Sequence, residues 1–199
     1  VTYYDGLGRP IQKIASKQSN TSKDIITPIE YDEFGRQSKE YLSYASSGSG
    51  LDYVNTALTD QPNFPQYSGQ VSYSQKRFEP SPLNRVLAQA APGNDWAMAN
   101  NHTIKFDYQT NVSADAVKMY TAPASSTNLA TLGYYAPSLT DNGIYPDYQL
   151  FKTVTKNENW VSGKNNTTEE YKDKDVKIVK VDVDEVVEAV NLIKTLEAY

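Results

Sequence analysis

The side chains of this 199-residue chain that could support acid–base or metal chemistry are one histidine and 24 aspartates and glutamates. The only histidine, His102, lies in a polar Asn-Asn-His-Thr stretch, and a general base or a histidine metal site needs positioned partners. Glu30, Asp32 and Glu33 could act as acid and base on a glycoside, which requires two carboxylates at a defined separation. On a strand, Glu30 and Asp32 share one face while Glu33 enters a turn. We therefore favour a surface position for His102 and a turn role for Asp32.

A second acidic group lies near the C-terminus: Asp173, Asp175, Asp182, Asp184 and Glu185. Such oxygen ligands suit Ca²⁺, but the spacing and the turn glycine of an EF-hand are missing. We interpret the group as a solvated strand edge followed by a helix cap. The absence of cysteine excludes thiol catalysis, disulfides and thiolate metal sites. The sequence also lacks a phosphate-binding loop and a G-x-S-x-G motif, so we predict no enzyme, no cofactor and no metal.

The most informative pattern is a recurring unit of the form Tyr-Asp-x-x-Gly-Arg. Each copy can form a strand end, a tight turn and the start of the next strand. The aspartate side chain caps the turn, and the glycine supplies a positive φ. The residues predicted to build the two full copies are Tyr4, Asp5, Gly8, Arg9, Tyr31, Asp32, Gly35 and Arg36.

Two further stretches match this unit in part. In the third copy Ser81 takes the place of the aspartate, Asn84 that of the glycine and Arg85 that of the arginine. Asparagine is the commonest non-glycine residue at positive φ, so the turn stays possible. In the fourth copy Val176 stands where glycine is expected and Lys177 where arginine is expected. A β-branched residue tolerates positive φ poorly, which argues against a fourth turn.

The arginines Arg9, Arg36 and Arg85 occupy the same place in their copies. They could form a ladder that faces a ligand. Alternatively, each arginine pairs with a neighbouring aspartate or stacks on a tyrosine of the adjacent hairpin, and we favour this interpretation. The tyrosines together with Trp96 and Trp160 could form a sugar-binding platform, but strand packing explains most of the sixteen tyrosines without it.

These copies and their flanking sequence resemble the RHS/YD-repeat family, in the bacterial branch common among Bacteroidetes surface and secreted proteins. The resemblance covers about residues 1–174, including the stretches 91–96, 150–160 and 167–174. It implies a β-hairpin array that in larger relatives spirals into a hollow shell around a C-terminal cargo, often a toxin. It also implies a secreted or cell-surface location. The copies are unevenly spaced, so this is not a strict tandem array.

The elements that must position these turns are mainly antiparallel β-strands. We predict two hairpins within residues 1–42, a strand–turn–strand over 71–89, and later strands at 104–108, 117–120, 148–155, 160–161 and 167–171. Residues 43–70 form a loop-rich insertion, with one or two helical turns over 51–58. A second polar loop is expected to run to about residue 142. Together these elements make one predicted region, residues 1–175.

Residues 176–199 differ in character and lie beyond the resemblance. Alternating apolar residues predict a short strand from Val176 to Val183, and helical spacing of apolar residues follows from Asp184. Asp182 with Glu185 has the form of a capping box. We predict a divergent β–α tail, which is either the opening of a different module or a sequence foreign to the repeat region.

Charge and length restrict the remaining functions. A net charge of −5 and an isoelectric point near 4.9 argue against a nucleic-acid binder. No apolar run approaches the roughly 18 to 20 residues needed to span a bilayer. The chain begins in the middle of a strand without methionine, so we expect a processed product or a piece of a longer polypeptide, and the rest of that polypeptide is its main partner. The expected function is a non-catalytic sheet segment of a shell or stalk; the alternative is an adhesin-like module that binds a glycan or a protein through aromatic loops.

Overall fold

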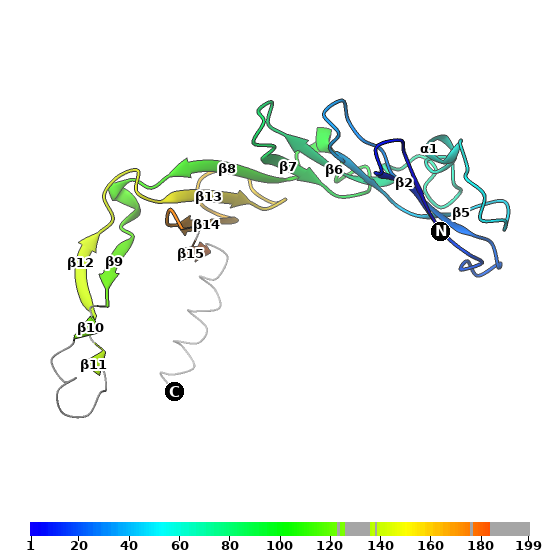
Figure 1. The fold of residues 1–199 in the computed structure, drawn as a ribbon. Helices are drawn as coiled ribbons and strands as arrows, with labels where there is room; N and C mark the ends of the chain where they lie inside the picture. The colour runs from blue at the N-terminus through cyan, green and yellow to red at the C-terminus, as the bar shows by residue number, and fades with distance from the viewer. Residues whose placement is uncertain (123, 126–135, 138, 176, 184–199) are drawn as a thin grey trace, which may run out of the picture. The chain divides into compact units, whose positions relative to one another are not determined.

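The computed structural model describes residues 1–122, 124–125, 136–137, 139–175 and 177–183. The chain is mainly β, with 37% strand and 6% helix among the described residues, as the sequence predicts (Figure 1). The predicted C-terminal helix over residues 184–199 lies outside the described residues. The chain divides into two compact units, Val1–Lys105 with Asn157–Asn159, and Phe106–Lys156 with the residues from Trp160 onward.

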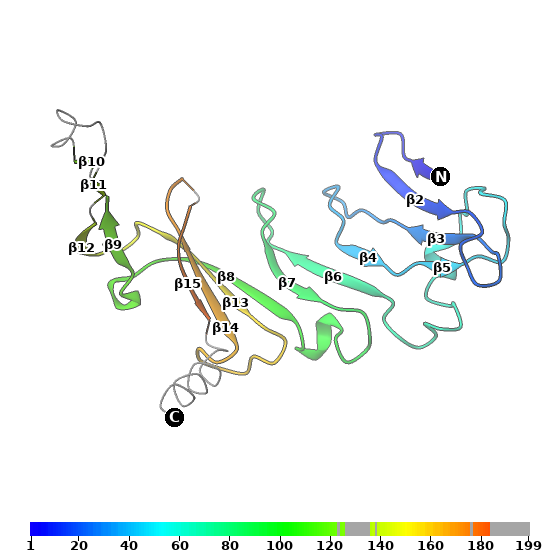
Figure 2. The ribbon, with the colours of Figure 1, turned by 90° about the horizontal axis from the view of Figure 1, so that it is seen from below.

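The first unit is a meander of antiparallel strands. Its strands are β1 (Thr2–Tyr4), β2 (Pro10–Ala15), β3 (Ile25–Pro28), β4 (Lys39–Tyr41), β5 (Tyr44–Ala45), β6 (Tyr73–Phe78) and β7 (Val86–Ala90). The start of β8 (Ile104–Thr110) pairs with β7. Figure 2 shows that the tips joining β1 to β2, β3 to β4 and β6 to β7 lie along one side of this unit.

Both hairpins expected within residues 1–42 form, and the second contains an irregularity. In the second hairpin, Ile29 pairs with Glu40 near the turn, and Ile26 pairs with Tyr44 farther along. The register shifts by one residue between these points, and β4 also pairs with β6 on its other side. The segment that contains β3 and β4 therefore pairs with the β1–β2 hairpin on one side and with the β6–β7 hairpin on the other.

The core of the first unit lies under the loop-rich insertion. Ile14, Ile26 and Tyr44 are buried in the sheet, and segments 51–57 and 64–67 cover them. Gln12 binds the insertion by two hydrogen bonds, donating to the Val54 carbonyl and accepting from the Val54 N–H. The predicted helical turns over 51–58 reduce to a single turn, α1 (Ala57–Asp60).

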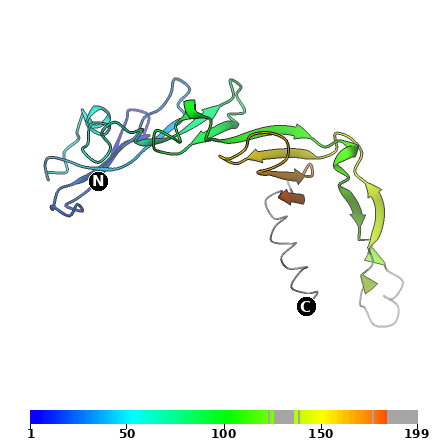
Figure 3. The same ribbon diagram turned by 180° about the vertical axis from the view of Figure 1, so that it is seen from behind.

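The second unit holds the remainder of β8 and seven further strands. They are β9 (Lys118–Thr121), β10 (Ala124–Ser125), β11 (Ala136–Pro137), β12 (Thr140–Ile144), β13 (Phe151–Lys156), β14 (Thr167–Lys172) and β15 (Ile178–Val183). β13, β14 and β15 pair side by side in antiparallel order (Figure 3). β15 shows that the strand part of the predicted tail adds to this sheet.

Two expectations for the second unit are wrong. The polar loop expected up to residue 142 contains the start of β12, which pairs with β9. All five residues of β12 are exposed, so the strand lacks the apolar alternation that identifies strands from sequence. The strand expected at 160–161 does not form; there the Trp160 indole donates to the Gly163 carbonyl at 3.0 Å and closes a loop, whereas the strand expected at 167–171 is β14.

Candidate functional site: a ladder of acid–arginine turns

Turn A, residues 5–9, joins β1 to β2. Asp5 Oδ1 accepts hydrogen bonds from the backbone N–H groups of Leu7 and Arg9, both at 2.9 Å. Asp5 Oδ2 binds the Arg9 guanidinium through Nε and Nη2, both at 2.7 Å. The Gly8 N–H donates to the Asp5 carbonyl at 3.0 Å, with Gly8 at a φ of +76°. One aspartate thus fixes the backbone of the turn and the position of its arginine.

Turn B, residues 32–36, repeats this geometry after β3. Asp32 Oδ1 accepts from the N–H groups of Phe34 and Arg36 at 3.0 and 2.8 Å, and Oδ2 accepts from Arg36 Nε at 2.8 Å. Gly35 has a φ of +75°, and its N–H donates to the Asp32 carbonyl at 2.9 Å. Turns A and B are therefore copies in three dimensions as well as in sequence.

In turn C, residues 79–85, two residues share the roles that one aspartate has in turns A and B: one binds the turn backbone and the other binds the arginine. Ser81 accepts from the N–H groups of Leu83 and Asn84, as expected for a residue in the aspartate's place. The partner of Arg85, however, is Glu79, which contacts the guanidinium at 2.7 to 3.0 Å. Asn84 has a φ of +53°, in keeping with its place at the glycine position.

Turn D, residues 173–177, belongs to the second unit. Asp173 Oδ1 accepts from the N–H groups of Asp175 and Lys177 at 3.0 and 2.8 Å, and the Asp173 N–H donates to the Lys177 carbonyl at 3.0 Å. These bonds are the counterparts of those in turn A. The argument from Val176 against a fourth turn is therefore wrong for the backbone closure; Val176 itself lies outside the described residues.

Turn A contacts turn B through its arginine. The Arg9 guanidinium lies over the ring of Tyr31, 4.5 Å from the ring centroid. Its Nη1 is 3.0 Å from the point that a Cβ on Gly35 would occupy. Tyr31 in turn donates its hydroxyl proton to the Pro10 carbonyl at 3.0 Å. Tyr4, which precedes Asp5 as Tyr31 precedes Asp32, is 60% exposed.

Turn B contacts turn C in the same way. The Arg36 guanidinium lies 4.8 Å from the ring centroid of Phe78, the residue before Glu79. It also donates to Asn84 Oδ1 at 3.1 Å and to the Glu79 carbonyl at 3.4 Å. Each of these two arginines therefore pairs with its own acid and reaches the aromatic residue and the positive-φ residue of the following turn. We call turns A, B and C with these contacts the turn ladder.

The pKa values of the ladder acids lie below their ordinary values. For Asp5 the main cause is the hydrogen bond from the Arg9 backbone N–H. Burial alone would raise the pKa of Asp32, but hydrogen bonds from the backbone and side chain of Arg36 outweigh it. The hydrogen bonds from the Arg85 side chain are the largest cause of lowering the pKa of Glu79 to about 2. All three acids are thus ionised at neutral pH.

Glu30 and Asp32, considered above as an acid–base pair, each have a different set of partners. Glu30 accepts a hydrogen bond from the Tyr41 hydroxyl at 2.7 Å and lies 3.4 Å from Lys39, while Asp32 is engaged with Arg36. Burial, followed by the contact with Glu30, raises the pKa of Tyr41. Among the described residues, no three His, Asp or Glu side chains gather in a way that could hold a metal ion.

The two tryptophans belong to different units. Trp96 is 41% exposed and meets the His102 ring edge-on, with 5.7 Å between centroids. Trp160 lies under Lys156, whose Nζ is 4.4 Å from its ring centroid. His102 is exposed, as expected, although its ring contact with Trp96 was not foreseen.

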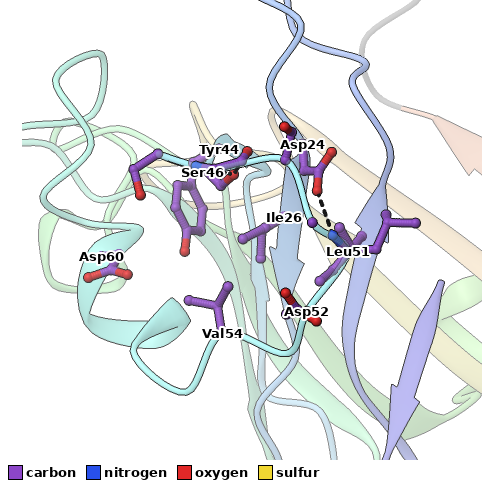
Figure 4. A pocket seen from close by; sticks show the side chains of 13 residues that line it. Asp24, Ile26, Tyr44, Ser46, Leu51, Asp52, Val54 and Asp60 are labelled. Carbon is purple, nitrogen blue, oxygen red and sulfur yellow. Dashed lines mark hydrogen bonds between the residues drawn. The ribbon is translucent and has the colours of Figure 1, made fainter.

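A cavity of about 190 Å³ lies beside the core of the first unit (Figure 4). Asp24 in its wall accepts from the backbone N–H groups of Lys17 and Leu51 at 2.8 and 2.9 Å. The bond from Lys17 is the main reason that the pKa of Asp24 lies below its usual value. The Tyr44 hydroxyl is buried without a hydrogen-bond partner in the described part of the chain, and burial raises its pKa to about 12. Asp24 therefore serves to hold the insertion to the sheet.

Sequence reasoning missed a buried charge cluster in the second unit. Lys152 Nζ lies 2.8 Å from Asp115 Oδ1 and 3.1 Å from Glu169 Oε1, and all three side chains are less than 10% exposed. The Tyr171 hydroxyl donates to Glu169 Oε2 at 2.8 Å. Burial alone would lower the pKa of Lys152, but its bonds to Asp115 and Glu169 outweigh this and raise it. Thr167, Glu169 and Tyr171 share the buried face of β14, but their residue types show no apolar alternation from which the sequence could predict this.

The fold and the ladder define the first unit as a β-hairpin array with acid–arginine turns. Residues 1–110 match the family DUF6443, a domain of unknown function. The match covers more than half of the chain, which therefore belongs to this family, and it includes turns A, B and C. No curated protein and no solved structure matches the chain. None of the helices in the described residues is long and apolar enough to cross a membrane.

Proposed function

We propose that this chain is a non-catalytic structural segment of a larger secreted or cell-surface RHS/YD-repeat protein. The observation that carries the proposal is the contact repeated along the turn ladder. Arg9 reaches Tyr31 and the position of Gly35, and Arg36 reaches Phe78 and Asn84. A contact that recurs from one turn to the next is what an array needs in order to add hairpins in a constant register.

The mechanism is architectural. Backbone ladders propagate the sheet from strand to strand, and each turn fixes the register of its hairpin. The arginine then sets the distance to the following turn, because its planar group binds its own acid at the edge while its face covers the next aromatic ring. A lysine would lack both the fork and the flat face.

The ion pairs support a structural role for the ladder over a ligand-facing one. Arg9 and Arg36 form ion pairs with Asp5 and Asp32, and the arginine side chains are 37% and 19% exposed. A site that recruits an anionic ligand would leave such charges available. The shell or stalk and its cargo or toxin are the part of the proposal that rests on the resemblance to RHS/YD-repeat proteins.

Reading the parent gene on both sides of this segment tests the proposal. We expect further Tyr-Asp-x-x-Gly-Arg units in the same frame and an unrelated domain at the C-terminal end. A reading frame without further units on either side would overturn the proposal and would favour a small binding module.

A further inference from the structure

A second cavity in the first unit, of about 480 Å³, lies beside Trp96. Its walls come from β6, β7, the turn-rich connection after β7, the start of β8 and the 157–159 stretch, all of which belong to this unit. Pro92, Ile104 and Ala90 provide apolar wall, and Trp96 adds an aromatic side chain. Small-molecule sites in proteins typically enclose about 300 to 1,000 Å³ and combine apolar walls with a few polar groups.

Polar side chains also line this cavity. Gln89, His102 and Glu158 line it, and no hydrogen bond or ion pair in the described residues engages their side chains. The Trp96 indole N–H likewise donates no hydrogen bond to the described residues. The ladder acids, by contrast, are all paired. A donor–acceptor set left open around an aromatic ring is suited to a polar ligand.

We propose that this cavity binds one or two pyranose rings of a neutral saccharide. The C–H groups on one face of a pyranose are weakly positive and pack against the electron-rich face of an indole. Gln and Glu offer paired atoms that bind neighbouring hydroxyl groups, and His offers a donor and an acceptor. This inference goes beyond the proposed structural function, since a segment of a surface shell can carry such a site without needing it to fold.

A cationic ligand is the main competitor for this cavity. Glu158 supplies one carboxylate, and Trp96 could bind a cation over its face. Gln89 and His102 add hydrogen-bonding atoms that a simple amine would leave unused, and buried polar groups without partners reduce affinity. The mixture of amide, imidazole and carboxylate therefore favours a ligand that carries several hydroxyl groups.

The test uses the intact chain on an array of neutral, acidic and amino-bearing glycans, followed by titration of the best neutral hit by calorimetry. We expect saturable binding that Trp96→Ala weakens at least tenfold. The matched control is Trp160→Ala, which removes a tryptophan of the second unit and should leave the affinity within twofold. Melting curves establish that each variant is folded; if Trp96→Ala is not, Trp96→Phe keeps a smaller platform and should bind a few-fold more weakly.

Glu158 separates the two ligand classes. Glu158→Gln keeps atoms that bind hydroxyl groups, so the affinity for a neutral saccharide should change less than about threefold, whereas Glu158→Ala should lower it at least fivefold. Loss of binding in Glu158→Gln together with a preference for amino-bearing ligands would overturn the proposal in favour of a cation site. Absence of saturable binding up to millimolar ligand, or equal binding by Trp96→Ala, would also overturn it. None of these results would affect the turn ladder.

Discussion

Gly8 and Gly35 have the same backbone conformation but different surroundings. Their φ angles are +76° and +75°, yet a Cβ on Gly8 would meet nothing within 4 Å, while one on Gly35 would lie 3.0 Å from Arg9 Nη1. Replacement by alanine at positive φ costs about 1 kcal/mol on backbone grounds alone. At Gly35 the contact with Arg9 therefore adds to the free-energy cost of an alanine substitution, and at Gly8 no such contact exists.

We predict that Gly35→Ala lowers the melting temperature more than Gly8→Ala, because the added methyl group displaces the Arg9 guanidinium from Tyr31. Thermal unfolding followed by circular dichroism measures both. In an Arg9→Gln background the difference between the two alanine variants should disappear. Equal losses in the native background would show that the arginine does not occupy the place against Gly35 described above.

The depressed pKa of Glu79 predicts how stability depends on pH. An acid whose pKa is lower in the folded state than in the unfolded state stabilises the fold above its unfolded value, and this contribution is lost as the pH falls through the folded value. For Glu79 the window runs from about 4.5 down to about 2. Asp5 and Asp32 shift in the same direction.

We therefore expect the melting temperature to hold from pH 7 to 5 and to fall steadily between about pH 4.5 and 2. Glu79→Gln should melt lower than the native chain at pH 7, and the two melting curves should converge at pH 2. Thermal scans over this range measure the effect. A difference between the two proteins that persists at pH 2 would contradict the ionic role of Glu79.

At the scale of elements, the sequence predicts the turns better than the strands that pair around them. The Tyr-Asp-x-x-Gly-Arg spacing predicts turns A and B because every bond of the turn is local. In turn C the spacing points to Ser81, whereas the aromatic–acid pair Phe78-Glu79 just before it indicates the ion-pair partner of Arg85. Exposed β12 and the loop closed by Trp160 could not be predicted, because neither has an apolar alternation.

Fold class was predictable from composition and turn chemistry, but the cavity beside Trp96 was not. Its walls lie on segments separated by more than fifty residues, so only the folded chain brings Glu158 to Trp96. The same reason hides the contact between Arg36 and Phe78. The local spacing of residues predicts the turn, whereas the contacts that the turn makes depend on tertiary packing.

At the scale of the whole molecule, the two units are stabilised in different ways. The first has an aliphatic and aromatic core of Ile14, Ile26 and Tyr44 under its insertion. The second places Lys152 between two carboxylates, next to a core that includes Leu150 and Tyr171. Removing one member of a buried charge cluster leaves the others without compensation.

We predict that Lys152→Met destabilises the second unit by roughly 3 kcal/mol, because Asp115 and Glu169 lose their shared cation. Trp160 reports on this unit, so urea unfolding of the Trp96→Phe protein, followed by fluorescence, measures the change. Lys13→Met, at an exposed position of β2, is the control and should have little effect. A Lys152→Met protein that unfolds at the same urea concentration as its parent would contradict the role of the cluster.

The most direct test of the turn ladder is a double-mutant cycle between Arg36 and Phe78. The free energy of unfolding is measured for the native chain, Arg36→Gln, Phe78→Leu and the double variant. We predict a coupling of about 0.5 to 1 kcal/mol, as for a cation over an aromatic ring. The same cycle with Arg77→Gln in place of Arg36→Gln should show no coupling, because Arg77 is exposed. Additive effects of Arg36→Gln and Phe78→Leu would contradict the claim that each turn positions the next.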